Sequence, residues 1–105
     1  MAFEVTNSNY KELIGSGKAV VIDFWAEWCG PCRRISPLID ELSTEFSGQN
    51  VVIGKCDVDA NDEVAIEYKV RNIPTIVFIK NGALVDKMVG ASTKEAIKEK
   101  ITALL

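Results

Sequence analysis

Short apolar runs rich in β-branched residues constrain the fold of this chain most. Three of them, at 18–25, 51–56 and 75–80, have the length and composition of strands that are buried on both faces. Between the first two, apolar residues recur with helical spacing and form one stripe: Ile35, Leu38, Ile39, Leu42 and Phe46. A buried strand, an amphipathic helix and a second buried strand together predict a sheet with a helix packed against its face.

The rest of the chain extends this pattern. Asn81-Gly82 is a type I′ hairpin signal, so the strand after it should run antiparallel to the strand before it. We expect, in addition, a strand at 3–5, helices at about 9–14 and 61–69, a strand at 83–89 and a last helix after Ser92. The order β-α-β-α-β-α-β-β-α predicts one three-layer α/β domain over 1–105, a mixed five-stranded sheet with four helices on both faces.

Local signals make further predictions about the helices. Ser92-Thr-Lys-Glu95 matches a capping box for the last helix, and Pro37 predicts a kink in the apolar stripe. The acidic segment 57–63 resembles a calcium loop, but Asp62 stands where that loop needs Gly and Tyr68 stands where it needs Glu. We therefore interpret the Asp and Asn residues of this segment as caps of the following helix.

Charge and hydropathy exclude two classes of partner. Lys and Arg number 12 and Asp and Glu 15, a net charge of −3, whereas a nucleic-acid surface needs dense positive charge. The longest uncharged apolar stretch, 73–79, is far shorter than the ~20 residues of a membrane span. The opening residues also lack the basic-then-apolar pattern of a signal peptide. We expect a soluble, unexported protein that binds neither nucleic acid nor membranes.

Cysteine usage limits the chemistry. The chain has 3 Cys and no His, which excludes His-based catalysis and leaves thiols or carboxylates. An odd count without a signal peptide argues against a disulfide-stapled secreted scaffold, so the close pair Cys29 and Cys32 indicates redox or metal chemistry. Zinc normally takes four ligands, and only Cys56 remains to join the pair. Redox chemistry is therefore favoured, a zinc site is the weaker alternative, and we expect no metal.

The pair lies in Trp28-Cys29-Gly30-Pro31-Cys32, between a buried strand and an amphipathic helix. The start of a helix favours a thiolate at Cys29, and a thiolate is the form that attacks a disulfide. Cys32, one helical turn later, can then attack the mixed disulfide. Pro31 suits the first turn, and Gly30 removes bulk beside the reacting sulfur. Two buried structural cysteines, the remaining alternative, fit a helix start less well.

Asp23 interrupts a strand that should be covered on both faces. A buried carboxylate without a partner is costly, and such groups concentrate at active sites. The strand leads directly into the cysteine loop, so we place Asp23 beneath the dithiol, the alternative being a solvated residue at a strand edge. Lys55 is the available cation, which either tunes Asp23 or is merely solvated. Pro74 can open its strand in trans or in cis, and sequence alone does not decide between them.

Segments along the whole chain carry a family resemblance. They are Asp23-Phe-Trp-Ala-Glu-Trp-Cys-Gly-Pro-Cys32, Pro37, Lys55-Cys-Asp-Val-Asp59, Val70-Arg-Asn-Ile-Pro-Thr75, Asn81-Gly82 and Val89-Gly90. On these segments the chain resembles the thioredoxin family. The resemblance implies a thioredoxin fold and a cytoplasmic, monomeric protein-disulfide reductase with no bound cofactor. Its partners would be disulfide-containing protein substrates and a separate flavin- and NADPH-dependent thioredoxin reductase.

The resemblance also implies roles for individual residues. Cys29 matches the family's exposed attacking thiol and Cys32 its buried resolving thiol. Asp23 matches the carboxylate that exchanges a proton with the resolving thiol, with Lys55 beside it. Pro74 matches a cis-proline that faces the dithiol, and the residue before it pairs through its backbone with an extended substrate segment. The apolar docking surface would comprise Trp28, Gly30, Pro31, Ile73, Pro74, Val89, Gly90 and Ala91.

Details of the motif favour one branch of the family. Gly-Pro between the cysteines resembles the reducing members, because oxidising and isomerising relatives carry a His before the second cysteine. Arg33 stands where Lys is more usual and keeps the positive charge. Cys56 is an additional cysteine, which we interpret as a small packing residue, the alternative being a regulatory thiol. The competing function is a thioredoxin-fold binding module or chaperone subunit with incidental cysteines.

Overall fold

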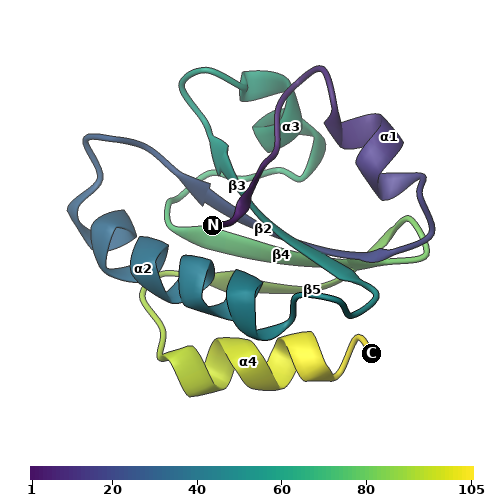
Figure 1. Ribbon diagram of the computed structural model, residues 1–105. Helices are drawn as coiled ribbons and strands as arrows, with labels where there is room; N and C mark the ends of the chain where they lie inside the picture. The colour runs from purple at the N-terminus through teal and green to yellow at the C-terminus, as the bar shows by residue number, and fades with distance from the viewer.

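Five strands and four helices make up the computed structural model, which describes residues 1–105 (Figure 1). In chain order they are β1 Phe3–Glu4, α1 Tyr10–Ile14, β2 Ala19–Trp25, α2 Gly30–Glu45, β3 Val51–Asp57, α3 Asp62–Glu67, β4 Thr75–Lys80, β5 Ala83–Val89 and α4 Lys94–Thr102. The predicted order of elements is confirmed. So is the three-layer arrangement, because α1 and α3 cover one face of the sheet and α2 and α4 cover the other.

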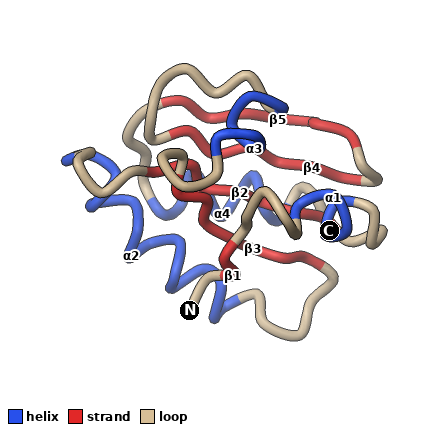
Figure 2. Tube along the Cα trace, turned by 90° about the horizontal axis from the view of Figure 1, so that it is seen from above, coloured by secondary structure: helices blue, strands red, loops and turns tan.

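The sheet is mixed, in the strand order β1-β3-β2-β4-β5 (Figure 2). β2 runs parallel to β3 and antiparallel to β4, so it is paired along both sides. Asp23 lies in this central strand, in register with Lys55 of β3 and Ile76 of β4. The alternative of a solvated residue at a strand edge is therefore wrong.

Alternation along β2 divides the apolar core into two parts. Val20, Ile22 and Phe24 pack on the face covered by α1 and α3, whereas Ala19 and Val21 pack against the residues of α2 and α4. The α2 side also contains Ile35, Ile39, Leu42, Phe46, Ile97, Ile101 and Leu104. By the same alternation Asp23 faces α2, the helix that starts at the cysteine pair.

Glycine is used in a tight turn and at one close approach of two strands. Asn81 and Gly82 both have positive φ, 52° and 78°, which confirms the I′-type turn between β4 and β5. At Gly54 in β3, a Cβ atom would lie 2.7 Å from Val5 Cγ2 and 2.8 Å from the carbonyl oxygen of Phe3. The pairing of β1 with β3 therefore requires a residue without a side chain at this position.

The start of α4 differs from the prediction. Thr93, not Ser92, is the N-cap, and its hydroxyl oxygen accepts a hydrogen bond from the N–H of Ala96 at 3.1 Å. Glu95 consequently stands at the second helical position instead of the third, where a capping box needs it. The predicted capping box is wrong because the helix begins one residue later.

The cap of α3 comes from a distant part of the chain. Asn61 occupies the N-cap position, but its side chain makes no capping hydrogen bond. Instead the side-chain oxygen of Asn7, in the loop before α1, accepts the N–H of Val64 at 3.2 Å. Asn61 accepts the N–H of Asn7 in return, at 3.1 Å. The local cap expected in the acidic segment is therefore wrong.

The longest helix, α2, runs unbroken through Pro37. Cys29 is its N-cap and Pro31 stands in its first turn, as the sequence predicts. No helix in the structure combines the length and the apolar character that a bilayer crossing requires.

Candidate functional site

A disulfide joins Cys29 and Cys32 at the start of α2, and their Cα atoms are 5.3 Å apart. The backbone N–H of Cys32 donates to Cys29 Sγ at 3.2 Å. This donor and the positive end of the helix dipole both stabilise negative charge on that sulfur. In the reduced protein the same geometry favours the thiolate at Cys29 over the thiolate at Cys32.

Both cysteines are buried in this disulfide form: Cys29 is 4% exposed and Cys32 is 1% exposed. The expectation of an exposed attacking thiol is therefore not met here. The reason is packing, because the pair clusters with Ala26 and against Val58 and Ile73. A Cβ atom added at Gly30 would meet no heavy atom within 4 Å, so the space above the first turn is open.

The loop before β4 lies against the disulfide. The Ile73–Pro74 peptide bond is cis, as the family resemblance implies. The carbonyl oxygen of Ile73 is 3.9 Å from Cys29 Sγ, and the carbonyl oxygen of Pro74 accepts the N–H of Gly90 at 2.8 Å. Three segments thus meet at one end of the sheet: the cysteine loop, the loop before β4 and the end of β5.

These segments carry the residues expected to form the docking surface. Trp28, Gly30, Pro31, Val89 and Ala91 are exposed, Ile73 and Gly90 are partly buried, and Pro74 is buried. Trp28 is 69% exposed, and its indole N–H donates to Asp59 Oδ2 at 2.8 Å. Sequence reasoning missed Asp59, which lies in the acidic segment interpreted as a helix cap.

Asp23 is fully buried, and neither of its carboxyl oxygens has a hydrogen-bond partner. Burial raises the pKa of Asp23 to about 7. The positive charge of Lys55 opposes this increase in pKa, and the negative charge of Asp40 adds to it. Asp23 can therefore both accept and release a proton near neutral pH.

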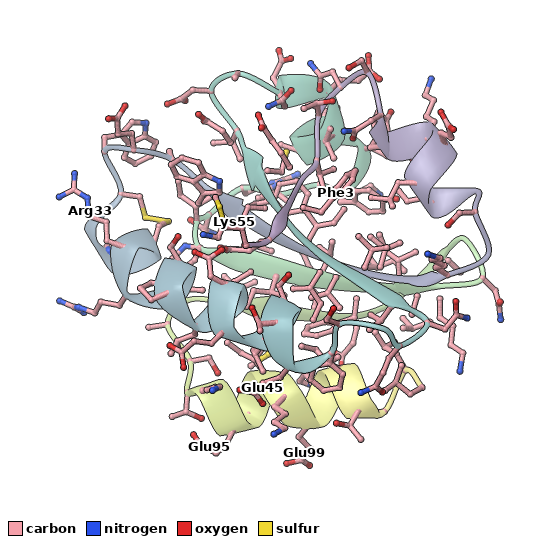
Figure 3. All side chains as sticks on the ribbon, in the orientation of Figure 1. Phe3, Arg33, Glu45, Lys55, Glu95 and Glu99 are labelled. Atoms are coloured by element: carbon pink, nitrogen blue, oxygen red, sulfur yellow. A yellow bond between two sulfur atoms is a disulfide. The ribbon has the colours of Figure 1, made fainter.

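Lys55 lies beside Asp23 in the sheet register, but its amine binds elsewhere. Nζ donates to Asp40 Oδ2 at 2.9 Å and to Ser36 Oγ at 2.5 Å, so Lys55 is held between β3 and α2 (Figure 3). Sequence reasoning missed Ser36 and Asp40. Their spacing of four residues on α2, beside the apolar stripe, is the signal that places them on one helix face.

Cys56 is separate from the cysteine pair. It is fully buried among the apolar residues on the α1 and α3 side of the sheet. Burial, followed by the nearby charges of Asp57 and Asp23, raises the pKa of its thiol to about 12. The thiol stays protonated at neutral pH, which fits a packing role.

No group of three or more His, Cys, Asp or Glu side chains has the geometry to hold a metal ion.

Comparisons with known proteins agree with this geometry. A protein-family model described as Thioredoxin matches residues 1–103. A thioredoxin of Chlorobaculum thiosulfatiphilum is 46% identical over 100 residues, which cover 94% of this chain and 92% of the relative. A thioredoxin of Rickettsia felis is 44% identical over 98 residues, with 92% of each chain covered.

Two further similarities concern a longer relative and a solved structure. A chloroplastic M-type thioredoxin of Pisum sativum is 45% identical over 98 residues, 92% of this chain and 56% of the relative. A solved structure from work on thiol resolution in a yeast mitochondrial 1-Cys peroxiredoxin, via glutathione and thioredoxin systems, superposes with a TM-score of 0.86. Its sequence is 35% identical, and the match covers 98% of this chain and 95% of that chain.

Proposed function

The chain belongs to the thioredoxin family, and from that premise we propose that it is a protein-disulfide reductase. It is a thiol-disulfide oxidoreductase, and its activity is dithiol/disulfide exchange. The observation that carries the proposed direction and residues is the Cys29–Cys32 disulfide at the start of α2, with Gly30 and Pro31 between the sulfurs.

The reaction proceeds in two exchanges. The Cys29 thiolate attacks one sulfur of a substrate disulfide, forming a mixed disulfide, and the second substrate sulfur leaves as a thiolate. The deprotonated Cys32 then attacks Cys29 Sγ, the Cys29–Cys32 bond forms, and the first substrate sulfur leaves as a thiolate. Two electrons pass to the substrate, whose thiolates take up protons from solvent.

Asp23 is the proposed proton acceptor for Cys32. It faces α2, the helix whose first turn carries Cys32, and it has no competing hydrogen-bond partner. A pKa of about 7 keeps both the protonated and the ionised form populated at neutral pH, which suits a group that takes and returns a proton. Lys55 acts on Asp23 at a distance through its charge.

The proposed docking surface surrounds the disulfide. Large exposed apolar side chains such as Trp28 and Val89 favour contact with a substrate segment. The backbone of Ile73, next to Cys29 Sγ, would pair with that segment as an added strand. The proposed surface comprises Trp28, Gly30, Pro31, Ile73, Pro74, Val89, Gly90 and Ala91.

The proposed partners are disulfide-containing proteins and an NADPH-dependent thioredoxin reductase that returns the pair to the dithiol state. We propose that the protein works as a monomer in the cytoplasm, where reducing conditions sustain this cycle. The pea relative, described as chloroplastic, shows that the family also serves another compartment. Cell fractionation tests the proposed location, and sedimentation tests the monomer.

Reduction of insulin coupled to NADPH oxidation through a thioredoxin reductase tests the function. We expect turnover with the wild type and none with Cys29→Ser, and the matched Cys56→Ala control should retain turnover. Absence of turnover in the wild type would instead support a thioredoxin-fold binding module or chaperone subunit. Replacing the reductase by a chemical dithiol separates a failure of the pair from a mismatch with that reductase.

A further inference from the structure

Two carboxylates, those of Asp23 and Asp40, lie near Lys55, and its ammonium group binds only that of Asp40. It is the in-register neighbour of Asp23 on β3. Its Nζ nevertheless donates to Ser36 Oγ and Asp40 Oδ2 on α2, while both oxygens of Asp23 lack a partner. The position of the ammonium group is therefore set by the helix and not by the neighbouring strand.

The alternative acceptors on α2 form a small polar site. Ser36 and Asp40 are four residues apart and lie on the same helix face. Asp40 Oδ1 also accepts the backbone N–H of Ala2 at 3.0 Å. Partial burial raises the pKa of Asp40, but the hydrogen bonds from Lys55 and Ala2 outweigh this and lower it overall. Asp40 is thus ionised at neutral pH and competes strongly for the ammonium group.

We propose that Ser36 and Asp40 are positioning residues, which hold the Lys55 ammonium against α2 and so keep the buried Asp23 free of a hydrogen-bond partner. The inference rests on the proposed role of Asp23 as proton acceptor for Cys32. If Lys55 turned to Asp23, the direct pair would favour the ionised carboxylate. A carboxylate stabilised in that way is a weaker base and takes the proton of Cys32 less readily.

Asp40 affects Asp23 in two ways that must be separated. Its negative charge raises the pKa of Asp23 directly, and its hydrogen bond fixes the place of the Lys55 charge, which lowers that pKa. The other titratable groups near Asp23 are Cys56 on β3 and the cysteine pair at the start of α2. The β4 neighbour, Ile76, carries no charge. Keeping the protein oxidised removes the titration of the cysteine pair.

The test is the titration midpoint of the Asp23 carboxyl carbon, followed by NMR in the oxidised full chain. Asp40→Asn should move the midpoint to lower pH by about one unit. The same substitution in a Lys55→Gln background should move it by less than about half as much, because no ammonium group is left to turn. Ser36→Ala should move the midpoint in the same direction by a smaller amount, and Ser36→Thr, which keeps the hydroxyl, should leave it unchanged.

Asp86→Asn is the matched control. Asp86 Oδ2, on β5, is paired with Lys100 Nζ, on α4, at 2.5 Å. The substitution therefore makes the same change in net charge as Asp40→Asn, but away from Asp23. The midpoint of Asp23 should stay within about 0.2 pH units in this variant, as expected for a distant, screened surface charge. If Asp40→Asn fails to fold, the cycle of Ser36→Ala with Lys55→Gln gives the same comparison.

Equal shifts for Asp40→Asn with and without Lys55 would overturn the proposal, because the charge of Asp40 would then act alone. No shift in either background would overturn it as well. Single-turnover rates across pH separate this inference from the proposed function. A midpoint that moves while the pH profile of mixed-disulfide resolution stays fixed supports the positioning role and removes Asp23 as the base.

Discussion

Replacing Asp23 by Asn should stabilise the protein at neutral and alkaline pH. Asn has the shape of the protonated carboxyl group but cannot ionise. In the wild type, burial raises the pKa of Asp23 from 3.8 to about 7. The contribution of a group with a raised pKa is fully present below the unfolded pKa and is lost as pH rises through the folded pKa. The wild type therefore loses stability progressively as pH rises from 3.8 to about 7, and above about pH 7 the ionised, buried Asp23 has its full destabilising effect.

The magnitude follows from the two pKa values. Each pH unit between them corresponds to about 1.4 kcal/mol in the free energy of unfolding. At pH 8, which is above both pKa values, the full difference between them contributes, and Asp23→Asn should raise the free energy of unfolding by about 4 kcal/mol. At pH 5 only the difference between the unfolded pKa of 3.8 and pH 5 contributes, and the gain in the free energy of unfolding should be about 2 kcal/mol. Below about pH 3 the two proteins should be equally stable.

Urea unfolding of the oxidised proteins at pH 5 and pH 8 measures both gains. Asp86→Asn serves as the control of opposite sign, because the hydrogen bond from Lys100 lowers the pKa of Asp86. Removing this carboxylate should therefore lower the free energy of unfolding above the unfolded pKa of Asp86. Resolution of a mixed disulfide should meanwhile slow in Asp23→Asn, which single-turnover kinetics record. An Asn variant with no gain in stability at pH 8, or with the same gain at both pH values, would refute the reasoning from desolvation.

Three further substitutions test other parts of the structure. Cys32→Ser should trap substrates as stable mixed disulfides on Cys29, seen by mass spectrometry; adducts in Cys29→Ser instead would reverse the two roles. Cys56→Ala should leave insulin reduction within about a factor of two, because the buried, protonated thiol takes no part in exchange; a tenfold loss would place it in the mechanism. Gly54→Ala should lower the free energy of unfolding by about 1–3 kcal/mol, since its Cβ would clash with Val5 and Phe3, and an unchanged denaturation midpoint would contradict this.

Elements fixed by local chemistry were predictable from the sequence. The strands at Thr75–Lys80 and Ala83–Val89 end where expected, because Asn81 and Gly82 both accept the positive φ of a tight turn. The cap of α3 was not predictable, because Asn7 supplies it from a loop that only the completed fold brings near. A capping signal read along the chain cannot reveal such a partner.

The candidate site also has features that the local sequence predicts and features that only the completed fold creates. The spacing of Cys29 and Cys32 and the apolar neighbours of Asp23 are local facts, and the structure agrees with both. The partner of Lys55 depends on how α2 crosses β3, and a long flexible side chain can reach several acceptors. The hydrogen bond from Trp28 to an acidic loop 31 residues away likewise exists only in the folded chain.

The fold also separates the sulfur atom of Cys56 from those of the cysteine pair. Cys56 packs with Tyr10 and Val64 in the core on the α1 and α3 side, whereas Cys29 and Cys32 form a separate buried cluster with Ala26 at the start of α2. A bond between Cys56 and Cys32 would require the fully buried Cys56 side chain to leave its place in the apolar core. Such a mispaired bridge would disrupt the packing of Cys56, so completing the core during oxidative folding favours its exchange for the Cys29–Cys32 bond. The architecture that buries the spare thiol thereby also selects the correct disulfide.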